Sequence, residues 1–134
     1  MHIAQGATVA VVDGQKLSLF RNTSNDAHPK LSALPAESVN TSNKSGGAGH
    51  SSSAANPDEA TKGEDGFAAG VAELLNRQAV EGKLKELLVI AAPKTLGELR
   101  KHYHAKTKDS LVGEISKDLT GQKSDDIERT IAAA

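Results

Sequence analysis

The sequence contains no cysteine and no tryptophan, and its aromatic side chains are Phe20, Phe67 and Tyr103. Without cysteine the chain has neither a disulfide framework nor a thiolate metal site. With so few aromatic rings, the core has to be built from aliphatic side chains. The formal net charge of −1 over 134 residues gives no general attraction to nucleic acid or to an anionic membrane.

Long hydrophobic runs are also missing. No stretch approaches the ~20 apolar residues that cross a bilayer, and residues 1–5 lack the basic start and apolar centre of a signal peptide. A chain of 134 residues fits one domain. We therefore expect one soluble, cytoplasmic domain that comprises residues 1–134, without a membrane span.

The most informative stretch is residues 85–93, in which positions 87–92 are an uninterrupted run of leucine, valine, isoleucine and alanine, bounded by Gly82 and Pro93. A short apolar run of this kind predicts a strand that is buried on both faces. Such a strand needs helices on both sides. It is therefore the centre of a predicted α/β domain.

Four further strands are predicted from the pattern. Residues 7–12 and 16–21 form a hairpin whose turn contains Asp13 and Gly14, a dipeptide suited to positive φ angles. Residues 30–39 form a weaker third strand, in which Pro35 cannot donate to a ladder and so requires a sheet edge. Residues 111–115 form a short strand towards the end of the chain.

Three helices are predicted from apolar periodicity. The first covers residues 65–81 and ends at Gly82, which suits a left-handed conformation. The second begins with a capping box, in which Thr95 caps the first turn and Glu98 reaches back, and Ser124 caps the last helix. The apolar residues expected to face the sheet are Phe67, Val71, Leu74, Leu75, Leu96, Leu99, Tyr103, Ile127 and Ile131.

The resulting order of elements is β-β-β-α-β-α-β-α. Right-handed crossovers place the first and last strands on either side of the central one. The prediction is a mixed five-stranded sheet in the order 3-2-1-4-5, with helices on both faces and Pro35 in an edge strand. Residues 40–64, which contain no Leu, Ile, Val or Phe, are expected to form a long, disordered or mobile loop before the first helix.

Three patches, taken together, resemble a bacterial family known as host attachment protein, or protein required for attachment to host cells. They are residues 11–14 with 19–20, residues 88–93 with 96–97 and 99–100, and residues 114–120. That family is in turn similar to the middle domain of archaeal and eukaryotic peptide-chain release factors. The resemblance implies the same fold: a three-strand meander, a long loop and an α-β-α-β-α continuation.

The resemblance also implies a function for the loop. In the release factors, a Gly-Gly-Gln tripeptide there promotes peptidyl-tRNA hydrolysis on the ribosome. Gly46 and Gly47 match the first two positions, but Ala48 stands in place of the glutamine, and His50 follows. The missing glutamine argues against hydrolytic activity. The alternative is that Gly46, Gly47 and His50 belong to a flexible glycine-serine segment.

A basic segment supplies candidate RNA- or phosphate-binding residues. They are Lys94, Thr95, Arg100, Lys101, Lys106 and Lys108, of which Thr95 stands at a predicted helix N-terminus. Asp13, Lys117 and Asp118 follow strands, and open α/β sheets place ligands at the carboxyl edge of their strands. The alternatives are a solvated helix face for the basic residues and a turn role for Asp118.

No cofactor and no metal site are expected. A metal-dependent nuclease of the ribonuclease H-like type needs carboxylates that converge at one end of the sheet, but the central strand ends in Ala91, Ala92 and Pro93. His102 and His104, two residues apart on a helix, would point to different sides of it.

The leading prediction is a release-factor-like domain that binds RNA or a ribosome and is not itself a hydrolase. The competing prediction is an attachment-related protein that acts through a protein partner without enzymatic chemistry. An exposed sheet edge is compatible with dimerisation, but no apolar surface stripe in the sequence demands it.

Overall fold

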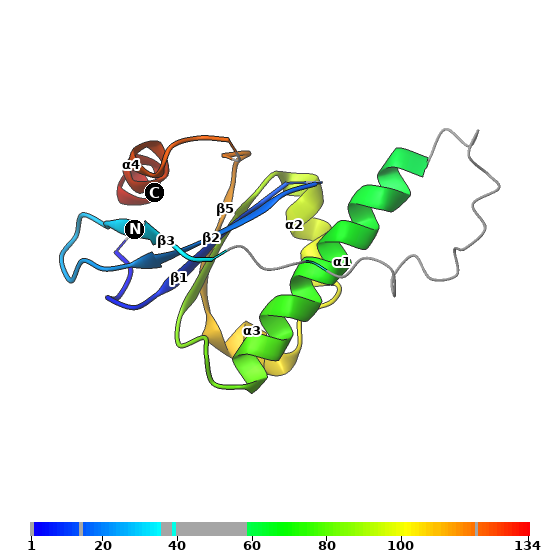
Figure 1. The fold of residues 1–134 in the computed structure, drawn as a ribbon, viewed down its shortest axis with the longest axis horizontal. Helices are drawn as coiled ribbons and strands as arrows, with labels where there is room; N and C mark the ends of the chain where they lie inside the picture. Colours follow the sequence, from blue (N-terminus) through cyan, green and yellow to red (C-terminus); the bar gives the residue numbers. More distant parts are fainter. Residues whose placement is uncertain (1, 14, 36–38, 40–58, 120) are drawn as a thin grey trace.

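The computed structural model describes residues 2–13, 15–35, 39, 59–119 and 121–134. Figure 1 shows the strands as one sheet, with α1, α2 and α3 on one side and α4 on the other. In chain order the elements of this part of the chain are β1 (Thr8–Val12), β2 (Leu17–Asn22), β3 (Leu31–Ala33), α1 (Glu59–Val80), β4 (Leu87–Ala91), α2 (Pro93–Arg100), α3 (Ala105–Ser110), β5 (Leu111–Ser116) and α4 (Ser124–Ala133).

The sheet has the strand order β3-β2-β1-β4-β5, which confirms the predicted order. β1 pairs antiparallel with β2, and β2 with β3, while β4 runs parallel to both β1 and β5. The parallel pairs follow from the helical connections, because a crossover through a helix returns the chain in the same direction.

The two central strands, β1 and β4, separate two aliphatic cores. Ala10 and Val12 of β1 face the core that lies under α1 and α2, and Val9 and Val11 face the core that lies under α4. All five residues of β4 have no exposed surface. Burial on both faces explains why this strand is an unbroken apolar run rather than an alternating pattern. The predicted central strand and the helices on both faces are therefore confirmed.

The aliphatic stripes of the helices also lie where the periodicity placed them. Val71 and Leu75 of α1 and Leu96 and Leu99 of α2 pack on one face of the sheet. Ile131 of α4 packs on the other, beside Ile127. Truncating a fully buried side chain of this kind costs roughly 2–5 kcal/mol.

The end of α1 has the predicted left-handed glycine. Gly82 has a φ of +79°, and the Lys83 amide donates to the Gln78 carbonyl at 2.8 Å while the Gly82 amide donates to Ala79 at 3.1 Å. This pair of bonds is a Schellman motif, which satisfies carbonyls that the helix end would otherwise leave without donors.

Several predicted boundaries were wrong. α1 begins at Glu59 rather than at residue 65, so the last six residues of the predicted loop, 59–64, are helical. The rest of that loop lies outside the described residues. β3 covers three residues at the sheet edge and ends before Pro35. Lys123, not Ser124, is the N-cap residue of α4.

The predicted second helix is in fact two helices. α2 ends at Arg100, and the separate helix α3, which the sequence did not predict, begins at Ala105. Tyr103 lies in the link between them and is still buried, as expected. None of the helices within the described residues is long and apolar enough to cross a membrane.

Candidate functional site

Five of the predicted site residues gather at one edge of the sheet. Val12, Ala91 and Ser116 end their strands at the same level, because Val12 pairs with Ala91 and Ala91 with Ser116. The chain therefore leaves all three parallel strands at a common carboxyl edge. The predicted residues found there are Asp13 after β1, Lys94 and Thr95 in the first turn of α2, and Lys117 and Asp118 after β5.

Asp13 shapes the hairpin turn at this edge. Its Oδ1 accepts hydrogen bonds from the amides of Gln15 at 2.6 Å and Lys16 at 2.5 Å. Its own amide donates to the Lys16 carbonyl at 3.0 Å. An aspartate that accepts from amides two and three residues ahead fixes a turn by itself. The carboxylate therefore positions the hairpin beside Lys94 rather than offering an uncommitted anion.

The N-terminus of α2 has no side-chain cap. The N-cap residue is Ala92, and Pro93 stands in the first turn, where the missing proline N–H is no loss. The predicted capping box is wrong, since Thr95 lies inside the helix and Glu98 binds Lys101 instead. The helix dipole makes this N-terminus attractive to an anion, and Lys94 and Lys117 add exposed positive charge beside it.

The other predicted basic residues do not share this edge. Arg100, at the far end of α2, donates to Glu114 of β5, with Nη2–Oε1 at 2.6 Å and Nε–Oε1 at 3.0 Å. This hydrogen bond is the main cause of the raised pKa of Arg100. Nε also reaches Glu114 Oε2 at 3.3 Å, so the guanidinium contacts both carboxylate oxygens, and Glu114 is the partner of the charge that the prediction assigned to phosphate.

Lys101, the C-cap residue of α2, likewise forms an ion pair with a residue of the same helix. Its Nζ lies 3.1 Å from Glu98 Oε2, and His102 Nε2 lies 3.4 Å from Glu98 Oε1. The hydrogen bond from Lys101 holds the pKa of Glu98 below its usual value, with a smaller contribution from His102. Lys101 therefore belongs to a local ion cluster on the helix surface.

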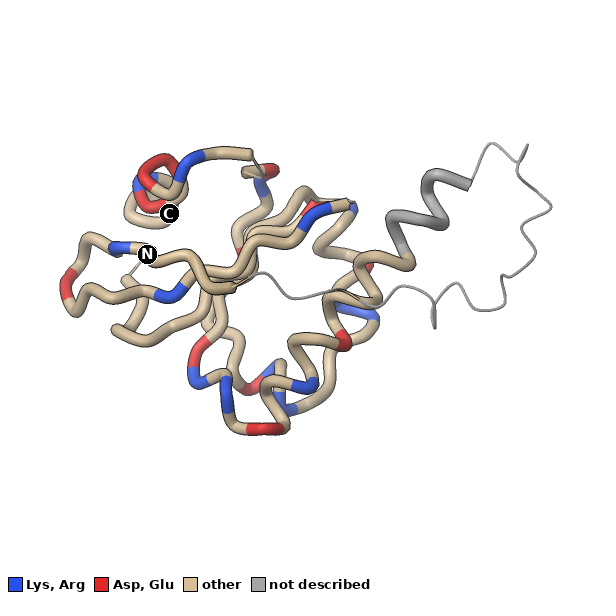
Figure 2. Tube along the Cα trace, in the orientation of Figure 1, with Lys and Arg blue, Asp and Glu red and all other residues tan. Residues whose placement is uncertain are grey.

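Lys106 and Lys108 lie on α3, which packs near the opposite end of the sheet. Figure 2 shows Lys and Arg at both ends of the molecule rather than on one face. Both lysines are exposed. They provide a natural comparison for the lysines at the carboxyl edge, because they carry the same charge at the other end of the same fold.

Asn76 of α1 determines where the second predicted helix breaks. Its Nδ2 donates to the His102 carbonyl at 2.8 Å, and its Oδ1 accepts from the His104 amide at 2.8 Å and from Thr107 Oγ1 at 2.6 Å. His104 in turn caps α3, since its Nδ1 accepts from the Lys106 amide at 3.0 Å. Sequence reasoning missed Asn76, because its partners lie 26 to 31 residues away. His104 is a cap residue and not, as predicted, part of a helix with His102.

Tyr103 lies in the same link between α2 and α3. It is 8% exposed, and within the described residues its hydroxyl has no hydrogen-bond partner. Burial raises the pKa of Tyr103 well above its usual value of 10.0. The ring therefore acts as a neutral, apolar anchor under α1.

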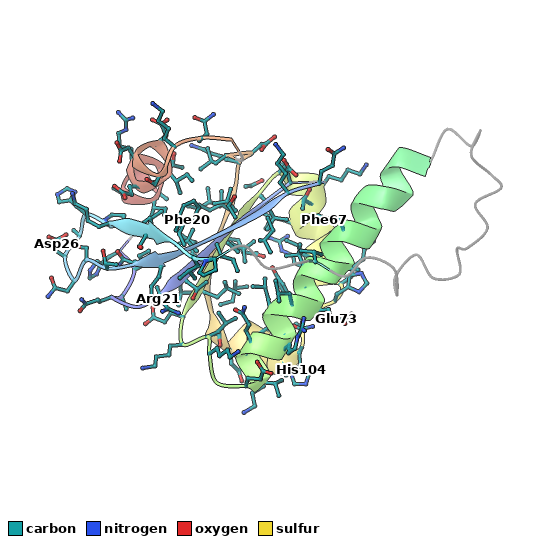
Figure 3. All side chains as sticks on the ribbon, viewed as in Figure 1. Phe20, Arg21, Asp26, Phe67, Glu73 and His104 are labelled. Carbon is teal, nitrogen blue, oxygen red and sulfur yellow. The ribbon has the colours of Figure 1, made fainter. Side chains whose placement is uncertain are left out.

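The candidate catalytic residues Gly46, Gly47 and His50 lie outside the described residues. Phe67 is among the first side chains of α1 that the structure describes, and it lies beside α2 (Figure 3). This part of α1 therefore lies at the end of the sheet where α2 packs. Within the described residues, no group of three His, Cys, Asp or Glu side chains could hold a metal ion.

Two comparisons with known proteins bear on this arrangement. No curated protein matches the chain. The family model of the bacterial archaeo-eukaryotic release factor family 12 matches residues 6–131. The match spans all five strands, α1 to α3 and all but the last two residues of α4, and it includes the carboxyl edge at Asp13, Lys94 and Lys117. The chain therefore belongs to the bacterial archaeo-eukaryotic release factor family 12.

Proposed function

We propose that this protein is a release-factor-like domain that binds RNA, in a ribosomal setting, through the carboxyl edge of its sheet. The observation that carries the proposal is the family match over residues 6–131. Family membership does not establish activity, so the choice of surface rests on the residues at the edge. There an uncapped helix N-terminus lies beside Lys94 and Lys117, a combination suited to the phosphates of a nucleic acid backbone.

The chemistry proposed for this domain is binding without hydrolysis. Gly46 and Gly47 reproduce two positions of the release-factor tripeptide, and Ala48 supplies neither a donor nor an acceptor in its side chain. A group that positions water against an ester has to hydrogen-bond to it. The domain would then occupy an RNA site without releasing a peptide.

Co-sedimentation with ribosomes across a salt series tests the proposed surface. The test variant is Lys94→Ala/Lys117→Ala at the carboxyl edge, and the matched control is Lys106→Ala/Lys108→Ala on α3. Each lost phosphate contact lowers the slope of log affinity against log salt by about 1. We expect the edge variant to bind more weakly and with a shallower salt slope, while the α3 variant resembles the wild type.

Two results would contradict this choice of surface or the binding itself. Equal weakening by both variants would mean that general positive charge, not the carboxyl edge, carries binding. A wild-type protein that fails to pellet with ribosomes at low salt would remove the translational setting altogether.

A peptidyl-tRNA hydrolysis assay tests the chemistry separately. We expect the wild type to be inactive, and Ala48→Gln, which restores the tripeptide sequence, to gain activity if the rest of the site is intact. Ala48→Ser serves as the control, because it adds a small polar group without restoring the tripeptide. Hydrolysis by the wild type would overturn the proposed loss of function.

A further inference from the structure

The two edges of the sheet differ in how they are protected. At one edge, β3 is three residues long, and its Leu31 amide donates to Glu128 Oε2 of α4 at 2.7 Å. Short edge strands and capped amides prevent a sheet from pairing with another chain. At the other edge, β5 is six residues long and has a sheet neighbour, β4, on one side.

The exposed surface of β5 has an apolar residue near its start. Val112 is 45% exposed and is one of two large aliphatic residues, with Val80, that the described structure leaves exposed. The pairing with β4 shifts here, since Leu87 pairs with Leu111 and Leu88 with Gly113. Val112 is therefore the extra residue of a bulge and has no partner position in β4.

Charges of opposite sign flank this strand. Asp109 stands at the end of α3, four residues before Gly113, and Lys117 stands four residues after it. Both are exposed, and neither forms an ion pair with another residue that the structure describes. An antiparallel copy of the same segment would reverse this order and bring the opposite charges together.

We propose that β5 pairs antiparallel with β5 of a second copy of this chain, about a two-fold axis near Gly113. Val112 of each copy then lies opposite Glu114 of the other, and Leu111 opposite Ile115. The axis also places the last turn of α3, which carries Asp109, beside the end of β5 in the other copy, where Lys117 follows the strand, and it does so twice. A two-fold interface uses the same patch on both subunits and must be self-complementary. This segment meets that condition in its charges, which favours a second copy over an unrelated extended peptide.

Sedimentation velocity over a wide range of protein concentration, in the absence of RNA, tests the proposal. The expected result is a concentration-dependent rise from the monomer mass of 13.9 kDa to twice that value. Asp109→Lys and Lys117→Asp should each weaken dimerisation about tenfold, because each turns two attractions between the copies into repulsions. Mixing the two variants should restore dimerisation, since both contacts of the mixed dimer then join opposite charges.

The exposed valines give a matched pair of variants for the strand contact. Val112→Glu places a carboxylate opposite Glu114 of the other copy, twice, and should abolish the dimer. Val80→Glu makes the same exchange on α1 and should leave the dimer unchanged. A protein that stays monomeric at every concentration overturns the proposal, as does a dimer that survives Val112→Glu or a mixture of charge variants that does not reassociate. None of these outcomes depends on RNA binding, so the proposed function is tested independently.

Discussion

Asn76→Ala tests whether a single amide fixes the link between α2 and α3. The amide makes three hydrogen bonds to this link, at 2.6 to 2.8 Å, and each is worth about 1 kcal/mol net. The substitution also leaves the hydroxyl of Thr107, which has no exposed surface, without that acceptor. Alanine recovers roughly 0.5 kcal/mol through its better helix propensity. We expect a loss of about 2–3 kcal/mol in the free energy of unfolding.

Urea denaturation followed by circular dichroism measures this loss, with the slope against urea unchanged if unfolding stays two-state. A double-mutant cycle with Thr107→Val isolates the contact between the two side chains. Because the stranded hydroxyl is then absent, the double variant should lose less than the sum of the single losses, by about 1 kcal/mol.

Arg77→Ala is the matched control, since Arg77 adjoins Asn76 on α1 but is exposed. Surface substitutions of this kind change stability by about 0.5 kcal/mol or less. An Asn76→Ala loss no larger than that of Arg77→Ala would refute the reasoning. The break between α2 and α3 would then have to arise from the packing of Tyr103 and not from the hydrogen bonds of Asn76.

Three further substitutions give direct readouts. Tyr103→Phe removes a buried hydroxyl that lacks a partner within the described residues, so the free energy of unfolding should rise by about 1 kcal/mol; a loss of stability would contradict this. Because burial raises the pKa of this sole tyrosine above 10.0, wild-type stability should fall as the pH rises past 10.0, and less so in the Phe variant. Glu98→Gln removes a carboxylate whose pKa is lowered by Lys101. Its contribution is present above pH 4.5 and is lost on acidification, so pH-dependent urea melts of this variant should be flatter below that pH. Gly82→Ala places a side chain at a φ of +79° and should lower the thermal midpoint, at a cost of about 1 kcal/mol.

The architecture followed from local patterns in the chain. The unbroken apolar run at β4 required a strand with both faces covered, and the periodicity of Val71, Leu75, Leu96 and Leu99 required helices to cover it. Once these elements were known, the handedness of the crossovers left one simple strand order. The same logic placed Asp13 and Lys117 at one edge, because residues that follow parallel strands must share it.

The start of α2 and the ion-pair partners of its basic residues did not follow from local patterns in the sequence. Thr95 and Glu98 have the spacing of a capping box, yet Pro93 already suits the first turn and the helix starts before Thr95. Arg100 and Lys101 are adjacent positive charges in the sequence, but Glu114 and Glu98 form ion pairs with them in the structure.

Tertiary contacts alone decided the break between α2 and α3 and the pairing of Arg100 with β5. Periodicity records how each side chain faces relative to its near neighbours, and this suffices to define a strand or a helix. A hydrogen bond from Asn76 to residues about 30 positions away, or an ion pair between α2 and β5, depends on segments that meet only after the sheet has formed. The fold therefore brings the basic residues of one segment to different ends of the molecule, and this separation leaves Lys94 and Lys117 together at the carboxyl edge.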